Sequence, residues 1–267
     1  MQKMIYINIT ILLATLLFSC NSESEGLNAD DSENLEVSEK PKRSFITSFE
    51  NVNDFDGFFI TPQGHLGTTF HELTESNVYS GTYSHRAWID GDNLQSAAAD
   101  KNHRGYPTVQ FRNTDEGPLK TPCYISLRVW LDIELNSNVA GEDDWFSFAT
   151  FTDDESDNWA RTVLVNLSSD GLVHLQHTTN QGEQNHIFQT TDIRFPQKQW
   201  VELTIYLNFT SNGYVKVWQD GELVSYAEIG NITNKLSQAH FGLYTPPQLS
   251  SGEVFNDDLL IKEVNEE

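Results

Sequence analysis

The stretch Trp200-Val-Glu-Leu-Thr-Ile-Tyr-Leu-Asn-Phe209 alternates apolar and polar or amphipathic side chains along its whole length. Its odd-numbered positions, from Val201 to Phe209, are all apolar. Successive side chains of a β-strand point to opposite faces, so this period of two predicts a strand with one face in a hydrophobic core and the other toward water.

The same alternation continues on both sides of this stretch. Asp220-Gly221 separates two short alternating runs, and this dipeptide favours the type I′ turn of a tight hairpin. A second hairpin is expected at Ser168-Ser-Asp-Gly171. Further strands are expected at Tyr124–Leu131, Trp145–Phe151, Ala239–Tyr244 and Val254–Ile261, and a short helix at Leu94–Lys101.

Helical periodicity does not persist anywhere between residues 44 and 267. About 220 residues of short strands separated by Gly, Asn, Asp and Pro predict one all-β domain, an antiparallel β-sandwich. The chain has only two cysteines. Cys123 starts an expected strand, so we interpret it as a small buried residue.

The N-terminus predicts export. Residues 1–19 contain one basic residue, Lys3, and then an apolar run that is too short to span a membrane, which is typical of a signal peptide. Residues 20–43 are acidic and rich in Ser and Asn, which predicts a flexible tether. The net charge of -23 disfavours nucleic acid as a partner.

Leu17-Phe18-Ser19-Cys20 resembles the lipobox of bacterial lipoproteins. The resemblance implies that Cys20 carries lipid and holds the protein to a membrane. The Ser/Glu cluster after Cys20 resembles the signal that sends lipoproteins to the outer face of the outer membrane in glycan-foraging bacteria. We therefore expect an outer-membrane lipoprotein exposed at the cell surface.

Three short motifs resemble those of concanavalin-like (laminin-G-like) jelly rolls, which include polysaccharide lyases of the alginate and heparin lyase type. They are Phe49-Glu50, Tyr79-Ser-Gly-Thr-Tyr-Ser84 and Phe255-Asn-Asp-Asp-Leu-Leu-Ile261. In such folds the first and last strands lie side by side and share a structural Ca²⁺. The resemblance implies that Glu50 and Asp257 or Asp258 bind it, as oxygen ligands suit this ion. The alternative is that these aspartates are a solvated strand end.

His240-Phe-Gly-Leu-Tyr244 resembles the Tyr-Phe-Lys-Ala-Gly-Val-Tyr-Asn-Gln strand of alginate lyases, with His240 at the lysine position and Pro246 at the final Gln position. The resemblance implies that Tyr244 acts as proton donor and acceptor. The alternative is an aromatic residue that merely lines a surface. Alternation places His240 and Tyr244 on one face, with Phe241 and Leu243 in the core.

Those lyases also carry a Gln-X-His strand and an Arg-rich strand, and neither motif is intact here. His174-Leu-Gln176 has the first pair in reverse order, and Gln110-Phe-Arg112 places Gln and Arg on one face of an expected strand. Elimination needs a group that neutralises the uronate carboxylate, a base for the C5 proton and an acid for the leaving oxygen. Gln110, Arg112, His174, Gln176 and Tyr244 are the candidates.

These observations predict a surface-anchored protein that binds a polysaccharide, with two outcomes open: binding alone, or cleavage by β-elimination. Trp159 and Trp218 are candidates for stacking on sugar rings, because polar neighbours place them near exposed loops. A third hypothesis is a non-catalytic adhesion or cell-envelope module that binds another protein, since fold does not fix function.

Overall fold

The computed structural model describes residues 42–55, 69–90, 102–137, 144–156, 158–178, 184–187, 192–229 and 233–266. These residues belong to one compact unit, Pro41–Glu267. Cys20, the signal peptide, the tether up to residue 41 and the expected helix at Leu94–Lys101 lie outside the described residues. Within the described part of the chain, no helix has the length and apolar character needed to cross a membrane.

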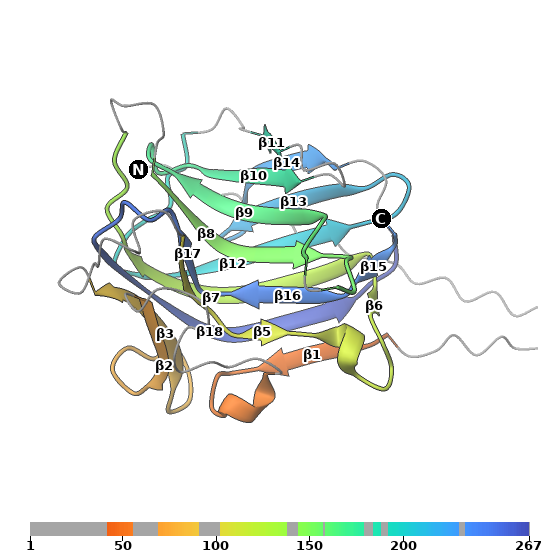
Figure 1. The fold of residues 1–267 in the computed structure, drawn as a ribbon, viewed down its shortest axis with the longest axis horizontal. Helices are drawn as coiled ribbons and strands as arrows, with labels where there is room; N and C mark the ends of the chain where they lie inside the picture. The colour runs from red at the N-terminus through yellow and green to blue at the C-terminus, as the bar shows by residue number, and fades with distance from the viewer. Residues whose placement is uncertain are drawn as a thin grey trace, which may run out of the picture. The chain divides into compact units, whose positions relative to one another are not determined.

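The larger of two main sheets has eight antiparallel strands (Figure 1). Its spatial order is β14 (Glu222–Glu228), β13 (Tyr214–Gln219), β12 (Trp200–Asn208), β7 (Cys123–Asp132), β18 (Ser251–Glu263), β3 (Ser84–Asp90) and β2 (Thr69–Thr74), with β1 (Ser44–Thr47) also paired to β18. The expected neighbourhood of the first and last strands is therefore confirmed.

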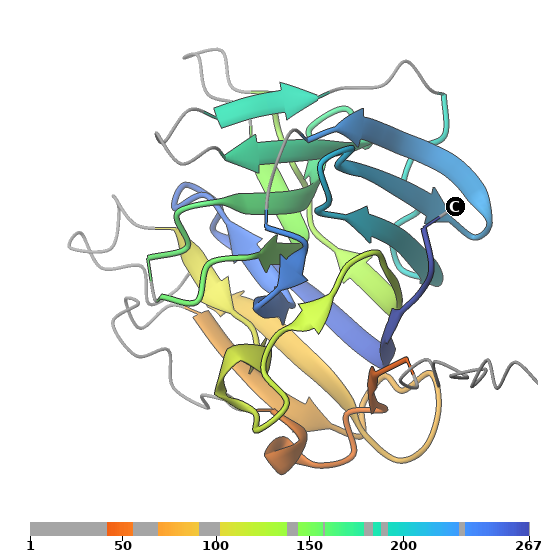
Figure 2. The ribbon, with the colours of Figure 1, turned by 90° about the vertical axis from the view of Figure 1, so that its right-hand side faces the viewer.

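The second sheet has six strands and lies over the first, and Figure 2 shows the two sheets as separate layers. Its order is β11 (Gln184–Ile187), β10 (Val173–Thr178), β9 (Thr162–Ser168), β8 (Trp145–Thr152), β16 (Gln238–Phe241) and β5 (Thr108–Val109). Smaller elements are the pairs β15 (Lys235–Leu236) with β6 (Leu119–Lys120) and β17 (Leu243–Thr245) with β4 (His103–Gly105), and the 3₁₀ turns η1 (Val52–Asp54) and η3 (Phe111–Asn113).

The hydrophobic core lies between the two sheets, as alternation predicts. The apolar positions of β12 from Val201 to Leu207 are buried, and so is Phe209 just after it. Each buried Leu, Ile, Val or Phe side chain contributes roughly 1.5–3 kcal/mol by leaving water. Cys123 is fully buried, and burial raises the pKa of its thiol to about 12, so it is a structural residue, as expected.

Both expected hairpins are present. β13 and β14 pair through Asp220 and Gly221, whose φ angles of 48° and 85° are those that a type I′ turn requires. β9 and β10 pair through the turn that ends at Gly171. Local turn chemistry therefore fixed these registers.

Two expected strands differ in the structure. The single strand expected at Ala239–Tyr244 is divided into β16 and β17 at Gly242, which has a φ of 134°. The strand expected at Gln110-Phe-Arg112 does not form, because β5 ends at Val109 and the chain turns into η3. The prediction that Gln110 and Arg112 share a strand face is therefore wrong.

Candidate polysaccharide site

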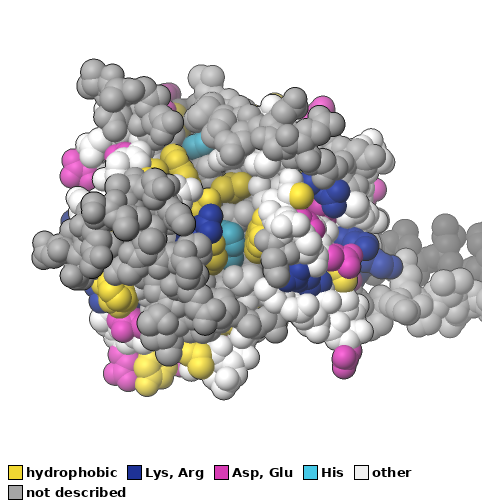
Figure 3. All heavy atoms as spheres, viewed as in Figure 1, with side chains coloured by type: hydrophobic (Ala, Val, Ile, Leu, Met, Phe, Trp, Pro, Cys, Tyr) yellow, Lys and Arg dark blue, Asp and Glu magenta, His cyan; other side chains and the backbone are white. Residues whose placement is uncertain are grey.

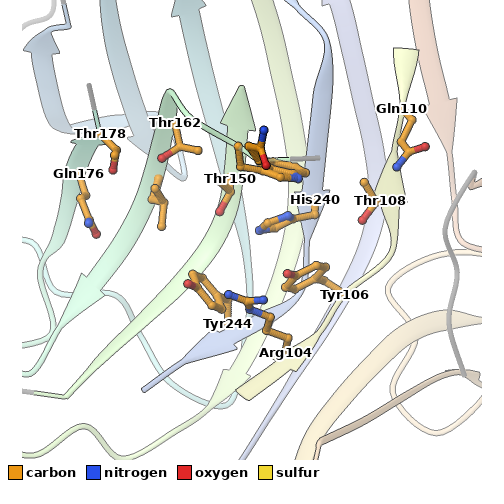
Figure 4. A pocket seen from close by; sticks show the side chains of 13 residues that line it. Arg104, Tyr106, Thr108, Gln110, Thr150, Thr162, Gln176, Thr178, His240 and Tyr244 are labelled. Atoms are coloured by element: carbon orange, nitrogen blue, oxygen red, sulfur yellow. The ribbon is translucent and has the colours of Figure 1, made fainter. Parts of the chain in front are cut away.

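A groove crosses the face of the six-stranded sheet that points away from the core (Figure 3). It has a volume of about 540 Å³. Its lining side chains are polar or aromatic with one aliphatic exception: Arg104, Tyr106, Thr108, Gln110, Thr150, Asn158, Trp159, Thr162, Leu164, Gln176, Thr178, His240 and Tyr244. Figure 4 shows these side chains and labels ten of them.

The floor of the groove is a row of residues paired across five strands. Thr108 lies opposite His240, and His240 lies opposite Thr150. The row continues through Leu164 to Gln176. Adjacent strands are about 4.8 Å apart, so these five positions extend over about 19 Å. The groove is therefore long enough for several sugar units lying across the strands.

His240 lies between two aromatic rings. The Tyr106 ring is parallel to the imidazole, with centroids 3.8 Å apart and planes at 9°. The Trp159 ring lies 4.7 Å away at 41°. Two rings at these distances cannot share one face of the imidazole, so they cover opposite faces. Only the edge of the imidazole lies outside this stack of rings.

Tyr244 is held by three neighbours. Asn102 Nδ2 donates a hydrogen bond to its hydroxyl oxygen at 3.1 Å. The Arg104 guanidinium lies 5.2 Å from the centre of its ring and also bonds to the hydroxyl. Trp145 packs edge-on against the ring, with centroids 5.0 Å apart. The hydroxyl therefore has a fixed place beside a positive charge.

Gly242 makes this arrangement possible. A Cβ atom at Gly242 would lie 2.6 Å from the carbonyl oxygen of Gly105 and 2.9 Å from the ring of His85. Only glycine fits this close approach and accepts the positive φ. The change of direction at Gly242 separates β16 from β17, so His240 and Tyr244 reach the groove from different strands.

The described lining of the groove carries one positive charge and no negative charge, although the chain has a net charge of -23. None of the lining residues that the structure describes is acidic, and Arg104 is the one basic residue among them. Burial, and then the charge of Arg104, lowers the pKa of His240 to about 3, so this imidazole is neutral. Burial raises the pKa of Tyr106 to about 12 against the opposing charge of Arg104. An anionic ligand therefore meets one guanidinium and several neutral donors.

The structure places the predicted site residues in different parts of this surface. Tyr244, Gln110 and Gln176 line the groove. Gln176 lies three strands from His240, or about 14 Å, and accepts a hydrogen bond from Asn166 Nδ2 at 3.1 Å. Gln176 therefore lies well away from His240 along the row, and it is suited to a different sugar unit from the one beside His240.

Arg112 and His174 do not line the groove. Arg112 lies in η3, and its guanidinium donates to the carbonyl oxygen of Glu155. His174 lies on the same face of β10 as Gln176, as the alternation of side chains predicts, but it is buried, with a relative exposure of 3%. Alternation along β10 predicted the sheet face on which His174 lies, but not that the side chain is buried.

Of the two tryptophans predicted to stack on sugar rings, one lines the groove and the other does not. Trp159 lines the groove, as expected of a sugar-stacking residue. Trp218 lies on β13 of the other sheet, beside Tyr124, with ring centroids 6.4 Å apart. Trp218 is therefore not part of this groove.

The carboxylates predicted to bind Ca²⁺ all accept hydrogen bonds from one loop, residues 79–82. Glu50 Oε1 accepts the backbone N–H of Thr82 at 2.8 Å, and Asp257 Oδ2 accepts those of Tyr79 and Ser80 at 2.9 and 3.0 Å. Asp258 Oδ1 accepts the Ser80 hydroxyl at 2.7 Å. The oxygen donors suit Ca²⁺, but among the described residues no three His, Cys, Asp or Glu groups form a metal cluster. The shared ion stays a prediction.

The sequence did not reveal the combination of Arg104, Tyr106 and His240. Neither Arg104 nor Tyr106 was among the site residues predicted from the sequence. His240 was placed on the Tyr244 face but given no role. The available signal was their high density of polar and aromatic side chains, His103-Arg-Gly-Tyr106 and His240 to Tyr244.

The chain is similar in fold to several solved structures. An endo-β-1,4-glucuronan lyase from the fungus Trichoderma reesei superposes with a TM-score of 0.55 and 13% identity, covering 80% of this chain and 93% of that chain. The cellulose-induced protein Cip1 superposes with a TM-score of 0.52 and 12% identity, covering 75% of this chain and 88% of that chain. At these identities the likeness shows the fold, an all-β jelly roll.

No curated protein matches the chain in sequence. The sequence profile described as polysaccharide lyase matches residues 62–260, which is most of the folded unit and contains all of the groove residues. The chain therefore belongs to the polysaccharide lyase family.

Proposed function

We propose that this protein cleaves a polysaccharide that contains uronic acid, by β-elimination in the groove of the six-stranded sheet. The observation that carries the proposal is the pairing of Tyr244 and Arg104. A fixed phenol hydroxyl and a guanidinium lie together in a groove whose described lining has no acidic side chain. Family membership supports the same chemistry.

In the proposed reaction, Arg104 binds the uronate carboxylate, and its positive charge stabilises the negative charge that develops there. Tyr244 transfers the protons. Tyr244 reacts as the phenolate: its oxygen takes the C5 proton and becomes a hydroxyl, and the electrons of the C5–H bond form the C4=C5 double bond. The C4–O bond breaks, and the new Tyr244 hydroxyl gives its proton to the leaving oxygen, which restores the phenolate. The products are a new chain end and an unsaturated uronate.

The other groove residues are suited to binding the polymer on either side of this centre. Gln110 lies beyond Thr108 at one end of the row, and Gln176 and Thr178 lie at the other end (Figure 4). Trp159 offers an aromatic face for the C–H side of a sugar ring. Such contacts favour cleavage within a chain.

The test is to incubate the purified protein with a panel of uronate polysaccharides and follow the ultraviolet absorbance of the conjugated double bond. Tyr244→Phe is expected to lower kcat by about 10²–10⁴-fold, the usual contribution of acid–base groups. Tyr79→Phe, the same change at an exposed tyrosine that does not line the groove, is the matched control and should leave kcat unchanged.

The absence of product from every uronate polymer would contradict the lyase proposal. Retardation of one polymer in an affinity gel without product would instead establish a binding protein. Neither product nor retardation with any polymer, together with a protein that co-purifies stably from membranes, would favour the adhesion hypothesis.

We also propose that Cys20 is the lipidated N-terminus of the mature protein and that the acidic tether carries the folded unit away from the outer membrane. The support is the sequence pattern around Cys20. Cells grown with a labelled fatty acid should incorporate the label into the wild type but not into Cys20→Ser. Equal labelling of both proteins would contradict the proposal.

A further inference from the structure

The imidazole of His240, in the floor of the groove, has two ring nitrogens without a hydrogen-bond partner among the described residues. Its side chain keeps a relative exposure of only 7%. Neither ring nitrogen makes a hydrogen bond to any residue that the structure describes. Buried polar atoms nearly always have a partner, and leaving one without costs about 1–3 kcal/mol. Both nitrogens are buried in the lining of the groove, so a group that enters the groove is the partner that this lining lacks.

The surroundings of His240 keep it neutral. The titratable side chains that face it are Arg104 from β4, Tyr106 after β4 and Tyr244 from β17, and no carboxylate of the described lining faces it. Burial and the Arg104 charge both lower the pKa of the imidazole. A neutral imidazole has one N–H donor and one acceptor nitrogen.

We propose that His240 is a neutral hydrogen-bond donor to the uronate carboxylate, acting with Arg104, and is not the base that removes the C5 proton. This inference rests on the proposed lyase function and deepens it by assigning a carboxylate-binding residue at the reacting sugar. In the reaction, transfer of the C5 proton to Tyr244 moves electron density into the carboxylate. The His240 N–H and the Arg104 guanidinium hold that density until the C4–O bond breaks.

Two features of the site favour a donor over a base. The Arg104 charge beside the imidazole opposes its protonation, as a second positive charge would have to form next to the first. The same charge attracts the carboxylate, which then needs a further donor for its remaining lone pairs. The aromatic rings on both faces of the imidazole keep its N–H fixed in direction, so little reorganisation is needed during the reaction.

The experiment compares His240→Gln with His240→Leu. Glutamine keeps an N–H donor at similar reach but cannot act as a base in the pH range of the assay, and leucine can neither donate nor accept. His177→Gln, the same change on β10 at a position outside the groove lining, is the matched control. Urea denaturation checks that each variant is folded.

We expect His240→Leu to lower kcat by about 10²–10³-fold, the cost of losing one donor to a developing negative charge. His240→Gln should retain kcat within about tenfold of the wild type, with an unchanged shape of the pH–rate profile. Equal losses in the two variants would overturn the proposal in favour of a base. Wild-type rates in both would also overturn it.

A binding measurement keeps this inference separate from the proposed function. Titration calorimetry would compare a uronate oligosaccharide with its methyl ester, using the wild type and His240→Leu. Loss of affinity for the uronate alone in His240→Leu supports the carboxylate contact, even when the wild type cleaves no polymer and the lyase proposal has failed. For a variant that does not fold, ¹⁵N signals of the wild-type imidazole should shift with the uronate oligosaccharide; unshifted signals would contradict the contact.

Discussion

Replacing Arg104 by methionine should separate activity from stability. The side chain keeps its approximate length but loses the charge and all donors. Arg104 is the one basic side chain in the described lining of the groove, so no neighbour there replaces its charge. The variant should bind and cleave a uronate polymer poorly while the fold persists.

The magnitude follows from two estimates. A hydrogen bond to a charged group contributes about 1.5–3 kcal/mol. Two unit charges about 4 Å apart interact by about 4 kcal/mol at an effective dielectric constant of about 20. We therefore expect a loss of about 2–4 kcal/mol of transition-state stabilisation, which is roughly a 30- to 1000-fold fall in kcat/KM.

The stability of the variant should change little. Arg104 is partly buried, so its removal relieves a desolvation cost while losing the contacts with Tyr244. These effects oppose each other, and we expect the free energy of unfolding to change by less than about 1 kcal/mol.

The assay is the ultraviolet rate on the polymer that the wild type cleaves, with urea denaturation for stability. Arg128→Met is the matched control, because Arg128 lies on β7 of the other sheet, paired with Glu202. It should leave kcat/KM unchanged. A kcat/KM for Arg104→Met within about threefold of the wild type would refute the assignment of Arg104 as the carboxylate ligand.

Three further predictions concern pH, calcium and the Trp159 loop. Burial lowers the pKa of His71 to about 4 and that of His85 further, so their stabilising effect is present above the unfolded value of 6.5 and is lost as the pH falls toward 4. This loss should outweigh the opposite effect of Asp257, whose pKa burial raises to about 6, so the free energy of unfolding should fall between pH 6.5 and 4.5. A free energy of unfolding that stays constant or rises over this range would contradict the prediction. Calcium at about 100 times its Kd should stabilise the fold by about 2.7 kcal/mol and raise Tm by roughly 5–10 °C, whereas the Tm of Asp257→Asn should not shift. A wild-type Tm that is unchanged by a chelator would contradict the predicted calcium site. Arg112→Ala removes the bond to the backbone of the loop that carries Trp159, so KM should rise about three- to tenfold with kcat nearly constant, whereas an unchanged KM would show that the loop needs no such support.

The roles of the site residues could be predicted only in part. The motif around Tyr244 led to a residue that does line the groove, although the strand expected there is divided at Gly242 and Tyr244 reaches the groove from β17. Arg112 was assigned by the same reasoning and lies outside the groove, because β5 has only two residues and the next turn is a 3₁₀ helix. His174 lies on the expected face but is buried, and the strand's own alternation does not specify how far that face is exposed.

The sequence by itself determined the class of fold, the two hairpins and the buried face of each long strand, because these depend on period-two alternation and on turn residues close together in the chain. Only the tertiary structure decided that β16 lies between β8 and β5 and that β17 pairs with β4. These pairings join segments far apart in the chain, and they bring Arg104, His240 and Tyr244 together. Local patterns specify which way a side chain points, but the identity of its neighbours depends on long-range strand pairing and packing.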